Sequence, residues 1–159
     1  MAKLKVGAKA PDFKLSDKDG SKISLKDLKA EFTVVYFYPK DDTPGCTIEA
    51  QGFNKDISKY KKLDISVIGI SGGDEKTKSK FCNKFNLKII LLSDSDFKIS
   101  KKYNSFGKKT FMGKTYDGIF RKTFILNDKR KIIKIYDKVT PETHSREILE
   151  EIKNSKKEQ

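Results

Sequence analysis

The sequence predicts a single α/β domain with three layers. Apolar runs of strand length alternate with segments whose apolar residues recur at helical spacing. Two further strands joined by a turn and then a last helix complete this order. At 159 residues the chain has the size of one domain and can bury a core.

The expected elements follow in a regular order. Short strands at residues 14–15 and 22–24 form an N-terminal hairpin extension, which leads into a short helix at 25–28. Longer strands are expected at residues 33–38, 65–71, 89–92, 122–126 and 132–136, with a turn at 127–129 before the last of them. Helices are expected from Cys46 to Tyr60, at 76–85, at 97–103 and through Ile148 and Ile152.

Two segments have a weaker pattern. We interpret residues 106–116 as a loop with apolar anchors, which either lines an active site or simply packs against the domain. The domain is expected to span residues 1–153, and the polar tail at 154–159 is expected to fray.

Cys46 is the leading candidate for chemistry. It ends a loop that runs from Pro39 to Cys46 directly after an apolar strand, and the helical pattern begins at its next residue. A cysteine in the first helical turn meets unpaired backbone N–H groups and the positive end of the helix dipole, which favour its nucleophilic thiolate form. Without this context, a lone cysteine on a helix is usually a small buried apolar residue.

The surrounding residues suit a reactive thiol. Thr43 can turn its hydroxyl toward the sulfur, and the rigid Pro39 shields one side of it. Asp41 and Asp42 disfavour a thiolate, so we expect both to point to solvent. Arg121, which precedes a predicted strand, is the candidate cation because its fork of donors can reach the sulfur.

Several motifs together resemble the peroxiredoxins. Pro39, Thr43 and Cys46 match the spacing of that family's active-site signature, and Arg121 lies in a matching segment at residues 118–124. The opening segments at 7–13 and 17–20 also match. The Phe37–Asp41 stretch and the motif Cys46-Thr47-x-Glu49-Ala50 most resemble the bacterioferritin comigratory protein, or Q-type, branch.

The resemblance implies a thioredoxin-like fold and a thiol peroxidase that acts on hydrogen peroxide or small organic hydroperoxides. In that family the cysteine matched by Cys46 attacks the O–O bond and becomes a sulfenic acid. The residues matched by Pro39, Thr43 and Arg121 hold the peroxide and stabilise the departing oxygen. The resemblance also implies recycling by a thioredoxin, no metal or organic cofactor, and a monomer.

The second cysteine departs from the pattern of many Q-type members, which carry it five residues after the first. This chain has Gln51 there, and Cys82 is its only other cysteine. Some Q-type enzymes place the resolving cysteine on the following helix, so we assign Cys82 that role through an intramolecular disulfide. The alternative is that Cys82 fills the core beside Phe81, which leaves a one-cysteine peroxidase recycled by an external thiol.

The placement of the two cysteines on different helices predicts a conformational change. A disulfide needs Cα atoms about 4.4–6.8 Å apart, whereas the peroxide pocket needs Cys46 in an intact helix start. We therefore expect the Cα atoms of Cys46 and Cys82 to lie beyond about 7 Å in the reduced protein, with local unwinding on oxidation.

The charge balance raises a rival class. Lys and Arg total 35 against 22 Asp and Glu, a net charge of +13, which is typical of nucleic-acid-binding proteins. The lysines are spread along the chain without a nucleic-acid motif, so we expect no dedicated nucleic-acid partner. A basic nucleic-acid-binding protein with an incidental thiol, a thiol–disulfide exchanger and a holdase chaperone remain alternatives.

The remaining features argue against other classes. No apolar run approaches the roughly 20 residues of a membrane span, and no signal-peptide core is visible, so we expect no membrane partner and a cytoplasmic location. The single histidine, His144, is interpreted as a surface residue near a helix start, not as the base of a Cys–His hydrolase. Two cysteines and one histidine do not supply a usual zinc site.

Overall fold

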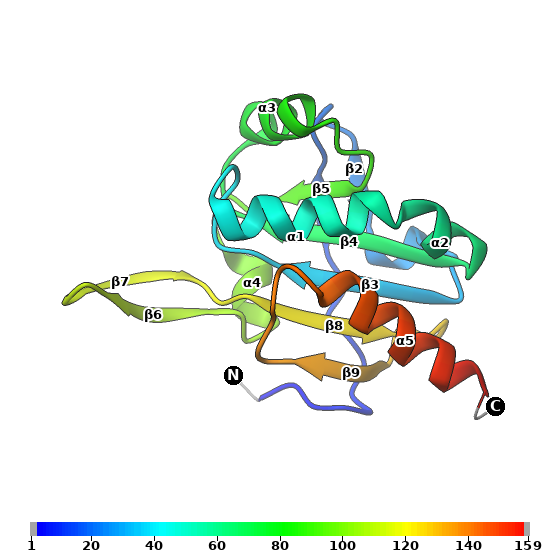
Figure 1. Cartoon of the computed structure of the whole chain (residues 1–159). Coiled ribbons are helices and arrows are strands. Elements are labelled where there is room, and N and C mark those ends of the chain that lie inside the picture. The colour runs from blue at the N-terminus through cyan, green and yellow to red at the C-terminus, as the bar shows by residue number, and fades with distance from the viewer. Residues whose placement is uncertain (1–2, 158–159) are drawn as a thin grey trace.

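The computed structural model describes residues 3–157 and has a seven-stranded sheet at its centre (Figure 1). Its strands lie in the order β2-β1-β5-β4-β3-β8-β9. The bounds are β1 (Lys14–Ser16), β2 (Lys22–Ser24), β3 (Phe32–Phe37), β4 (Ile65–Ser71), β5 (Ile90–Ser93), β8 (Lys122–Leu126) and β9 (Ile132–Tyr136). Strands β3, β4 and β5 run parallel, and the outer pairs are antiparallel.

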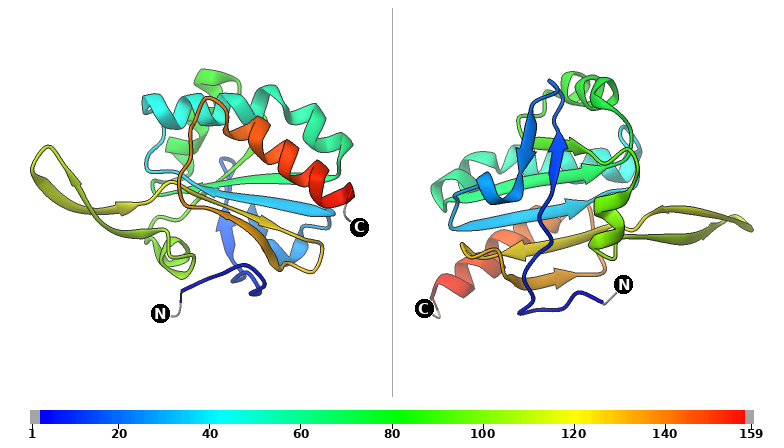
Figure 2. Two further views of the ribbon diagram at one scale, coloured as in Figure 1. Left: turned by 60° about the horizontal axis from the view of Figure 1, so that its bottom comes forward. Right: turned by 180° about the vertical axis from the view of Figure 1, so that it is seen from behind.

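Helices cover both faces of this sheet, which confirms the predicted three layers. Their bounds are η1 (Leu25–Asp27), α1 (Pro44–Lys55), α2 (Ile57–Lys62), α3 (Glu75–Phe85), α4 (Lys98–Lys102) and α5 (His144–Lys157). Helices α1, α2 and α5 lie on one face, and α4 lies on the other with the N-terminal segment (Figure 2).

Strand β3 separates the two halves of the core. All six of its residues are buried, as expected for a central parallel strand. Val34 and Tyr36 belong to the core cluster shared with α1, α3 and α5, whereas Val35 and Phe37 belong to the cluster on the other face. The strand therefore fixes the position at which the chain enters the Cys46 helix.

The segment expected to be a loop at 106–116 is instead a β-hairpin, so that prediction is wrong. Strands β6 (Phe106–Phe111) and β7 (Lys114–Ile119) pair only with each other and project away from the domain (Figure 1). Met112 and Gly113 form the two-residue turn, both with positive φ. Because most of the hairpin is exposed on both faces, it lacks the apolar alternation that predicts a strand.

The helix expected to run from Cys46 to Tyr60 is divided at Asp56 into α1 and α2. Tyr60 donates its hydroxyl to the backbone oxygen of Ser145, and Ser145 Oγ donates to Asp56 Oδ2 at 2.8 Å. These contacts connect Asp56 and Tyr60 to α5, a tertiary influence that local periodicity does not reveal.

The C-terminal helix continues through part of the predicted tail. Residues 154–157 are helical, which corrects the expectation of fraying for them, and residues 158–159 lie outside the described part of the chain. Lys156 Nζ donates to the backbone oxygen of Leu63 at 2.9 Å and lies 3.1 Å from Glu31 Oε2. A polar tail is therefore fixed by its lysine rather than by apolar packing.

The N-terminal segment runs along the outer side of β9. Gly7 N donates to Ile132 O at 2.8 Å, Ile132 N donates to Ala8 O at 2.9 Å, and Ala10 N donates to Arg130 O at 2.9 Å. The segment thus continues the backbone hydrogen bonding of the sheet beyond its last named strand.

Candidate active site

The Cys46 thiol lies in the first turn of α1, as the sequence predicts. Thr43 occupies the N-cap position with extended backbone angles, and Pro44 is the first helical residue. Cys46 is 1% exposed, and its backbone N–H is among those at a helix start without an intrahelical acceptor. The position therefore offers the sulfur a positive local field and little water.

Arg121, in the connection between β7 and β8, reaches the sulfur. Its Nη2 donates to Cys46 Sγ at 3.4 Å, and its Nη1 donates to Glu49 Oε1 at 2.7 Å. Burial opposes the charge, but Cys46 and Glu49 together raise the pKa of Arg121. A Cβ at Gly45 would lie 3.0 Å from Nη2, so glycine there makes room for the guanidinium.

Glu49 is a site residue that the sequence reasoning did not single out. It follows Cys46 by three positions on α1, so both side chains lie on one helix face. Burial raises its pKa to about 7, although Arg121 opposes this shift. Its second oxygen, Oε2, has no hydrogen-bond partner within residues 3–157. The signal for it was present in the Cys46-Thr47-x-Glu49-Ala50 motif.

Lys109 on β6 is a second such residue. Its Nζ donates to the backbone oxygen of Ile119 at 2.9 Å. Burial and Arg121 lower its pKa, while Cys46 opposes this shift, so the three side chains interact electrostatically. Lys109 comes close to Arg121 and Cys46 only because residues 106–119 fold into a hairpin. No local sequence pattern predicts this position.

Thr43 and Pro39 flank the loop before the helix. Thr43 Oγ1 donates its proton to the backbone oxygen of Lys40 at 2.8 Å, so the hydroxyl is left as a hydrogen-bond acceptor for any further partner. Both Thr43 and Pro39 are half-buried. The loop thus holds the Thr43 hydroxyl in a fixed orientation.

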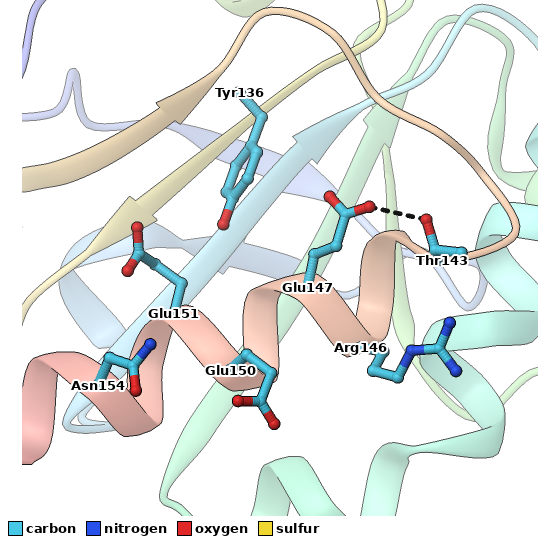
Figure 3. Close-up of a pocket in the computed structure, with 7 residues that line it drawn as sticks. All are labelled: Tyr136, Thr143, Arg146, Glu147, Glu150, Glu151 and Asn154. Atoms are coloured by element: carbon cyan, nitrogen blue, oxygen red, sulfur yellow. Dashed lines mark hydrogen bonds between the residues drawn. The ribbon is translucent and has the colours of Figure 1, made fainter.

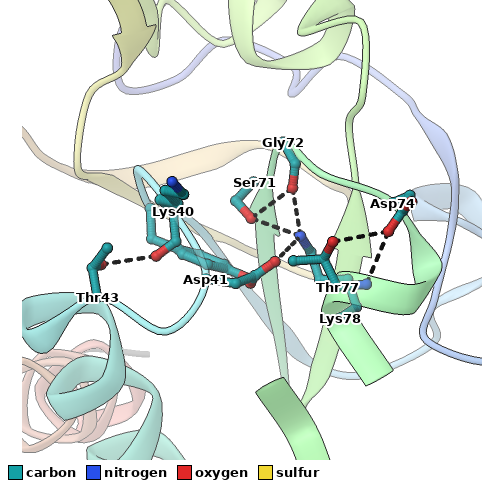
Figure 4. A network of polar contacts seen from close by, with 9 residues as sticks. Lys40, Asp41, Thr43, Ser71, Gly72, Asp74, Thr77 and Lys78 are labelled. Carbon is teal, nitrogen blue, oxygen red and sulfur yellow. Dashed lines mark hydrogen bonds and ion pairs between the residues drawn. The ribbon is translucent and has the colours of Figure 1, made fainter. Parts of the chain in front are cut away.

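The expectation for Asp41 is wrong, whereas Asp42 is exposed as expected. Asp41 is 7% exposed and accepts from the Tyr38 hydroxyl at 2.6 Å. It also accepts from Lys78 Nζ at 2.7 Å (Figure 4). Asp42 pairs with Lys84 at 2.8 Å. Asp41 is buried because α3 supplies a cation, a tertiary contact that the loop sequence does not encode.

Cys82 lies on α3, 3% exposed, and both cysteines are free thiols. Burial raises the pKa of Cys82, and Lys18 opposes this shift. Cys46 and Cys82 belong to the same core cluster. The separation of their Cα atoms in the reduced state stays a prediction.

His144 is buried, so its interpretation as a surface residue is wrong. It begins α5, its Nε2 lies 2.7 Å from Thr123 Oγ1, and its ring packs edge-on against Phe53 and Tyr136. Burial lowers its pKa to about 4, which keeps the ring neutral. The first turn of α5 faces the sheet, and the polar sequence around His144 concealed this.

A separate hollow lies elsewhere on the surface. It has a volume of about 750 Å³ and lies along α5 beside Tyr136, Arg146 and the carboxylates of Glu147, Glu150 and Glu151 (Figure 3). It is wide open, and its described lining includes none of the predicted site residues.

Among residues 3–157, no helix is both long and apolar enough to cross a membrane.

Comparison with known proteins gives a consistent result. Residues 6–135 match the AhpC/TSA family. The putative peroxiredoxin bcp of Helicobacter pylori is 43% identical over 152 residues, covering 96% of this chain and 100% of the relative. Peroxiredoxin Bcp of Escherichia coli is 39% identical over 153 residues, covering 96% and 98%.

Solved structures agree with these relatives. Xylella fastidiosa PrxQ superimposes with a TM-score of 0.90 at 27% identity, covering 98% of this chain and 99% of the other. The bacterioferritin comigratory protein of Xanthomonas campestris gives 0.87 at 30% identity and covers 97% of both chains.

The chain therefore belongs to the AhpC/TSA family and is a peroxiredoxin, a thiol-dependent peroxidase with a thioredoxin-like fold. Its similarity to proteins named Bcp and PrxQ places it in the Q-type branch.

Proposed function

We propose that Cys46 is the residue with which this peroxiredoxin attacks hydrogen peroxide and small organic hydroperoxides. The observation that carries the proposal is the hydrogen bond from Arg121 Nη2 to Cys46 Sγ at the start of α1. A cation and a helix start both favour the thiolate, which is the nucleophile. A published structure of the Xanthomonas campestris relative concerns alkyl peroxide reduction, which supports the organic substrates.

In the proposed reaction the Cys46 thiolate attacks one peroxide oxygen, an S–O bond forms and the O–O bond breaks. The sulfur is oxidised to a sulfenic acid, and the departing oxygen leaves as alkoxide or hydroxide and takes up a proton. Arg121 stabilises the charge that develops on that oxygen. Thr43, whose proton is committed to Lys40, accepts a hydrogen bond from the peroxide, and Pro39 shields the sulfur.

We propose that Cys82 resolves the sulfenic acid. Its thiol and the Cys46 sulfenic acid condense to a disulfide and water, and a dithiol protein of the thioredoxin type then reduces the disulfide. Two cysteine-to-serine variants of Xanthomonas campestris peroxiredoxin Q have been solved, and the replaced positions are as far apart in sequence as Cys46 and Cys82. This spacing supports the assignment.

A one-cysteine cycle is the second candidate. The observation that favours it is the burial of Cys82, which is 3% exposed in a core cluster and so resembles ordinary packing. In this case an external thiol would reduce the Cys46 sulfenic acid.

The first experiment measures peroxide consumption by the Cys46→Ser variant with a thioredoxin system. We expect complete loss, while Cys82→Ser still consumes one equivalent of peroxide and forms a sulfenic acid. Consumption by Cys46→Ser at the wild-type rate would contradict the assignment of Cys46.

The second experiment decides between the two cycles by peptide mapping after one equivalent of peroxide. We expect a Cys46–Cys82 linkage within one chain in the wild type. If that linkage is missing and Cys82→Ser is recycled by thioredoxin as fast as the wild type, the one-cysteine cycle is correct.

Two further assignments remain part of the proposal. A cytoplasmic location suits an enzyme whose two thiols must return to the reduced form, and a monomer is retained for its oligomeric state. Nucleic-acid binding that survives both Cys46→Ser and roughly 0.2 M salt would instead favour the rival class of basic binding protein.

A further inference from the structure

Lys78 on α3 is a fully buried ammonium group. Its Nζ donates to Asp41 Oδ2 at 2.7 Å, to Ser71 Oγ at 2.8 Å and to the backbone oxygen of Gly72 at 2.6 Å (Figure 4). The side chain is 0% exposed. A lysine is almost never fully buried unless it is paired with an opposite charge. The pair with Asp41 therefore sets the protonation state of Lys78.

The ion pair connects two parts of the site that the catalytic cycle must separate or reorient. Asp41 lies in the loop between β3 and α1, and Cys46 follows it on the same stretch of chain. Lys78 lies on α3, the helix that carries Cys82. A movement of the Cys46 loop relative to α3 therefore acts directly on the contact between Asp41 and Lys78.

Lys78 also lies close to Cys82. The two residues are four positions apart on α3, so their side chains share one helix face. The other charged groups that face Cys82 are Asp41 from the loop and Lys18 and Asp19 from the turn between β1 and β2. Burial raises the pKa of Cys82, Asp41 and Asp19 act in the same direction, and Lys18 and Lys78 oppose them.

We propose that the ion pair between Asp41 and Lys78 acts as a charge latch. It keeps the Cys82 thiol protonated, and therefore unreactive, until the Cys46 loop opens. In the closed state Asp41 neutralises Lys78 and holds the loop against α3. Burial lowers the pKa of Lys78, whereas Asp41 and a Cys82 thiolate both raise it. When the loop leaves with Cys46, the Cys82 thiolate replaces Asp41 as the counter-ion of the Lys78 ammonium, and the two charges stabilise each other. This inference rests on the proposed role of Cys82 as the resolving cysteine.

The latch places the activation of Cys82 at the step that needs it. The Cys82 thiolate attacks the sulfur of the Cys46 sulfenic acid, the S–S bond forms, the S–O bond breaks, and hydroxide leaves and takes up a proton to give water. Before the loop opens, the closed pair keeps Cys82 protonated, so the thiol does not compete for peroxide.

The test isolates this resolving step. Reduced protein is mixed with one equivalent of hydrogen peroxide and quenched with acid at successive times, and mass spectrometry follows the sulfenic acid and the Cys46–Cys82 disulfide across a pH series. The variants are Asp41→Asn, which keeps an oxygen acceptor for Tyr38 and Lys78, and the double variant Asp41→Asn with Lys78→Met, which also removes the ammonium.

We expect Asp41→Asn to form the disulfide faster than the wild type, with the midpoint of its pH profile moved to lower pH. The double variant has the same weakened loop contact but should resolve at least about tenfold more slowly than Asp41→Asn near neutral pH, since one unit of thiol pKa changes the thiolate fraction about tenfold. The difference should shrink as the pH rises, because the Cys82 thiol becomes ionised in both variants.

Equal rates and equal pH profiles for Asp41→Asn and the double variant would overturn the latch while leaving Cys82 as the resolving cysteine. If the wild type forms no Cys46–Cys82 disulfide, the role of Cys82 and the latch both fall. Should the double variant fail to fold, Cys82 alkylation by iodoacetamide is compared in Cys46→Ser with and without Asp41→Asn. We expect Asp41→Asn to move the pH midpoint of alkylation downward, and an unchanged midpoint would contradict the latch.

Discussion

Arg121 uses two of its nitrogens for two different partners. One lies 3.4 Å from the Cys46 sulfur and the other 2.7 Å from a Glu49 oxygen. A lysine has one nitrogen at the end of its side chain and does not reproduce this fork. The guanidinium thus sets both the charge and the orientation of the site.

We expect Arg121→Lys to slow peroxide attack on Cys46 by roughly ten- to a hundredfold, the effect of losing about 1.5–3 kcal/mol of charge-assisted hydrogen bonding. The measurement is the second-order rate constant for sulfenic acid formation. Arg146→Lys, an exposed substitution on α5, is the matched control and should keep the wild-type rate. A wild-type rate constant in Arg121→Lys would remove Arg121 from the peroxide pocket.

Glu49 makes stability depend on pH in an unusual direction for a carboxylate. Burial raises its pKa to about 7, so the folded protein holds a proton that the unfolded chain releases near pH 4.5. Its stabilising effect is therefore fully present below about pH 4.5 and is lost as the pH rises through about 7, by no more than about 1.4 kcal/mol per pH unit.

We expect Glu49→Gln to remove this dependence while it keeps an oxygen acceptor for Arg121. Urea unfolding between about pH 4.5 and 7.5 would measure the change in slope. A slope identical to that of the wild type would show that Glu49 is already ionised across this range.

Single residues were predictable where a local motif sets their role. Cys46 follows from a strand that leads into a helix, and the guanidinium of Arg121 reaches it as predicted. The predictions that Asp41 and His144 are exposed were wrong, because the burial of a residue depends on what packs against it. Lys78 and Thr123, which are distant in sequence, decide those two cases.

At the level of elements, helix α5 is held to the sheet through a neutral histidine. His144 Nε2 lies 2.7 Å from Thr123 Oγ1 on β8, in a site that water does not reach. Burial lowers the pKa of His144 to about 4, whereas an exposed histidine titrates near 6.5. Its contribution to stability is present above about pH 6.5 and is lost as the pH falls toward 4.

We expect His144→Gln to resist acid better than the wild type by up to about 3 kcal/mol near pH 4, because glutamine can reach Thr123 without taking up a proton. Urea unfolding at acid pH measures this difference in the free energy of unfolding. The effect has the opposite sign to that of Glu49 over the same range, so both single variants and their combination belong in one pH series. An unchanged acid slope would mean that His144 titrates normally.

Most elements were predictable because their faces are half or fully buried. Strands β2, β4, β8 and β9 have the predicted bounds. The β6–β7 hairpin was not predicted because its stability comes from pairing and a two-residue turn, with Phe111 65% and Met112 87% exposed. Apolar periodicity measures burial, so it does not detect an exposed hairpin.

For the whole molecule, the class of fold was predictable but the order of strands was not. Alternating elements indicate three layers, yet only tertiary pairing puts β1 next to β5 and β3 between β4 and β8. This order gathers the Cys46 loop, Arg121 and α3 around the carboxyl end of β3. The resemblance to a known family supplied the thioredoxin-like fold before any pairing was visible.

The N-terminal segment along β9 has a consequence for how separate molecules meet. An open strand edge offers unpaired N–H and C=O groups to another chain, and such edges promote aggregation. Here the hydrogen bonds of Gly7, Ala8 and Ala10 occupy that edge. A chain that begins at Pro11 should self-associate as its concentration rises, most clearly in salt that screens the +13 charge, and sedimentation velocity would reveal it. In the full chain, the segment prevents the β9 edge of one molecule from pairing with a strand of another.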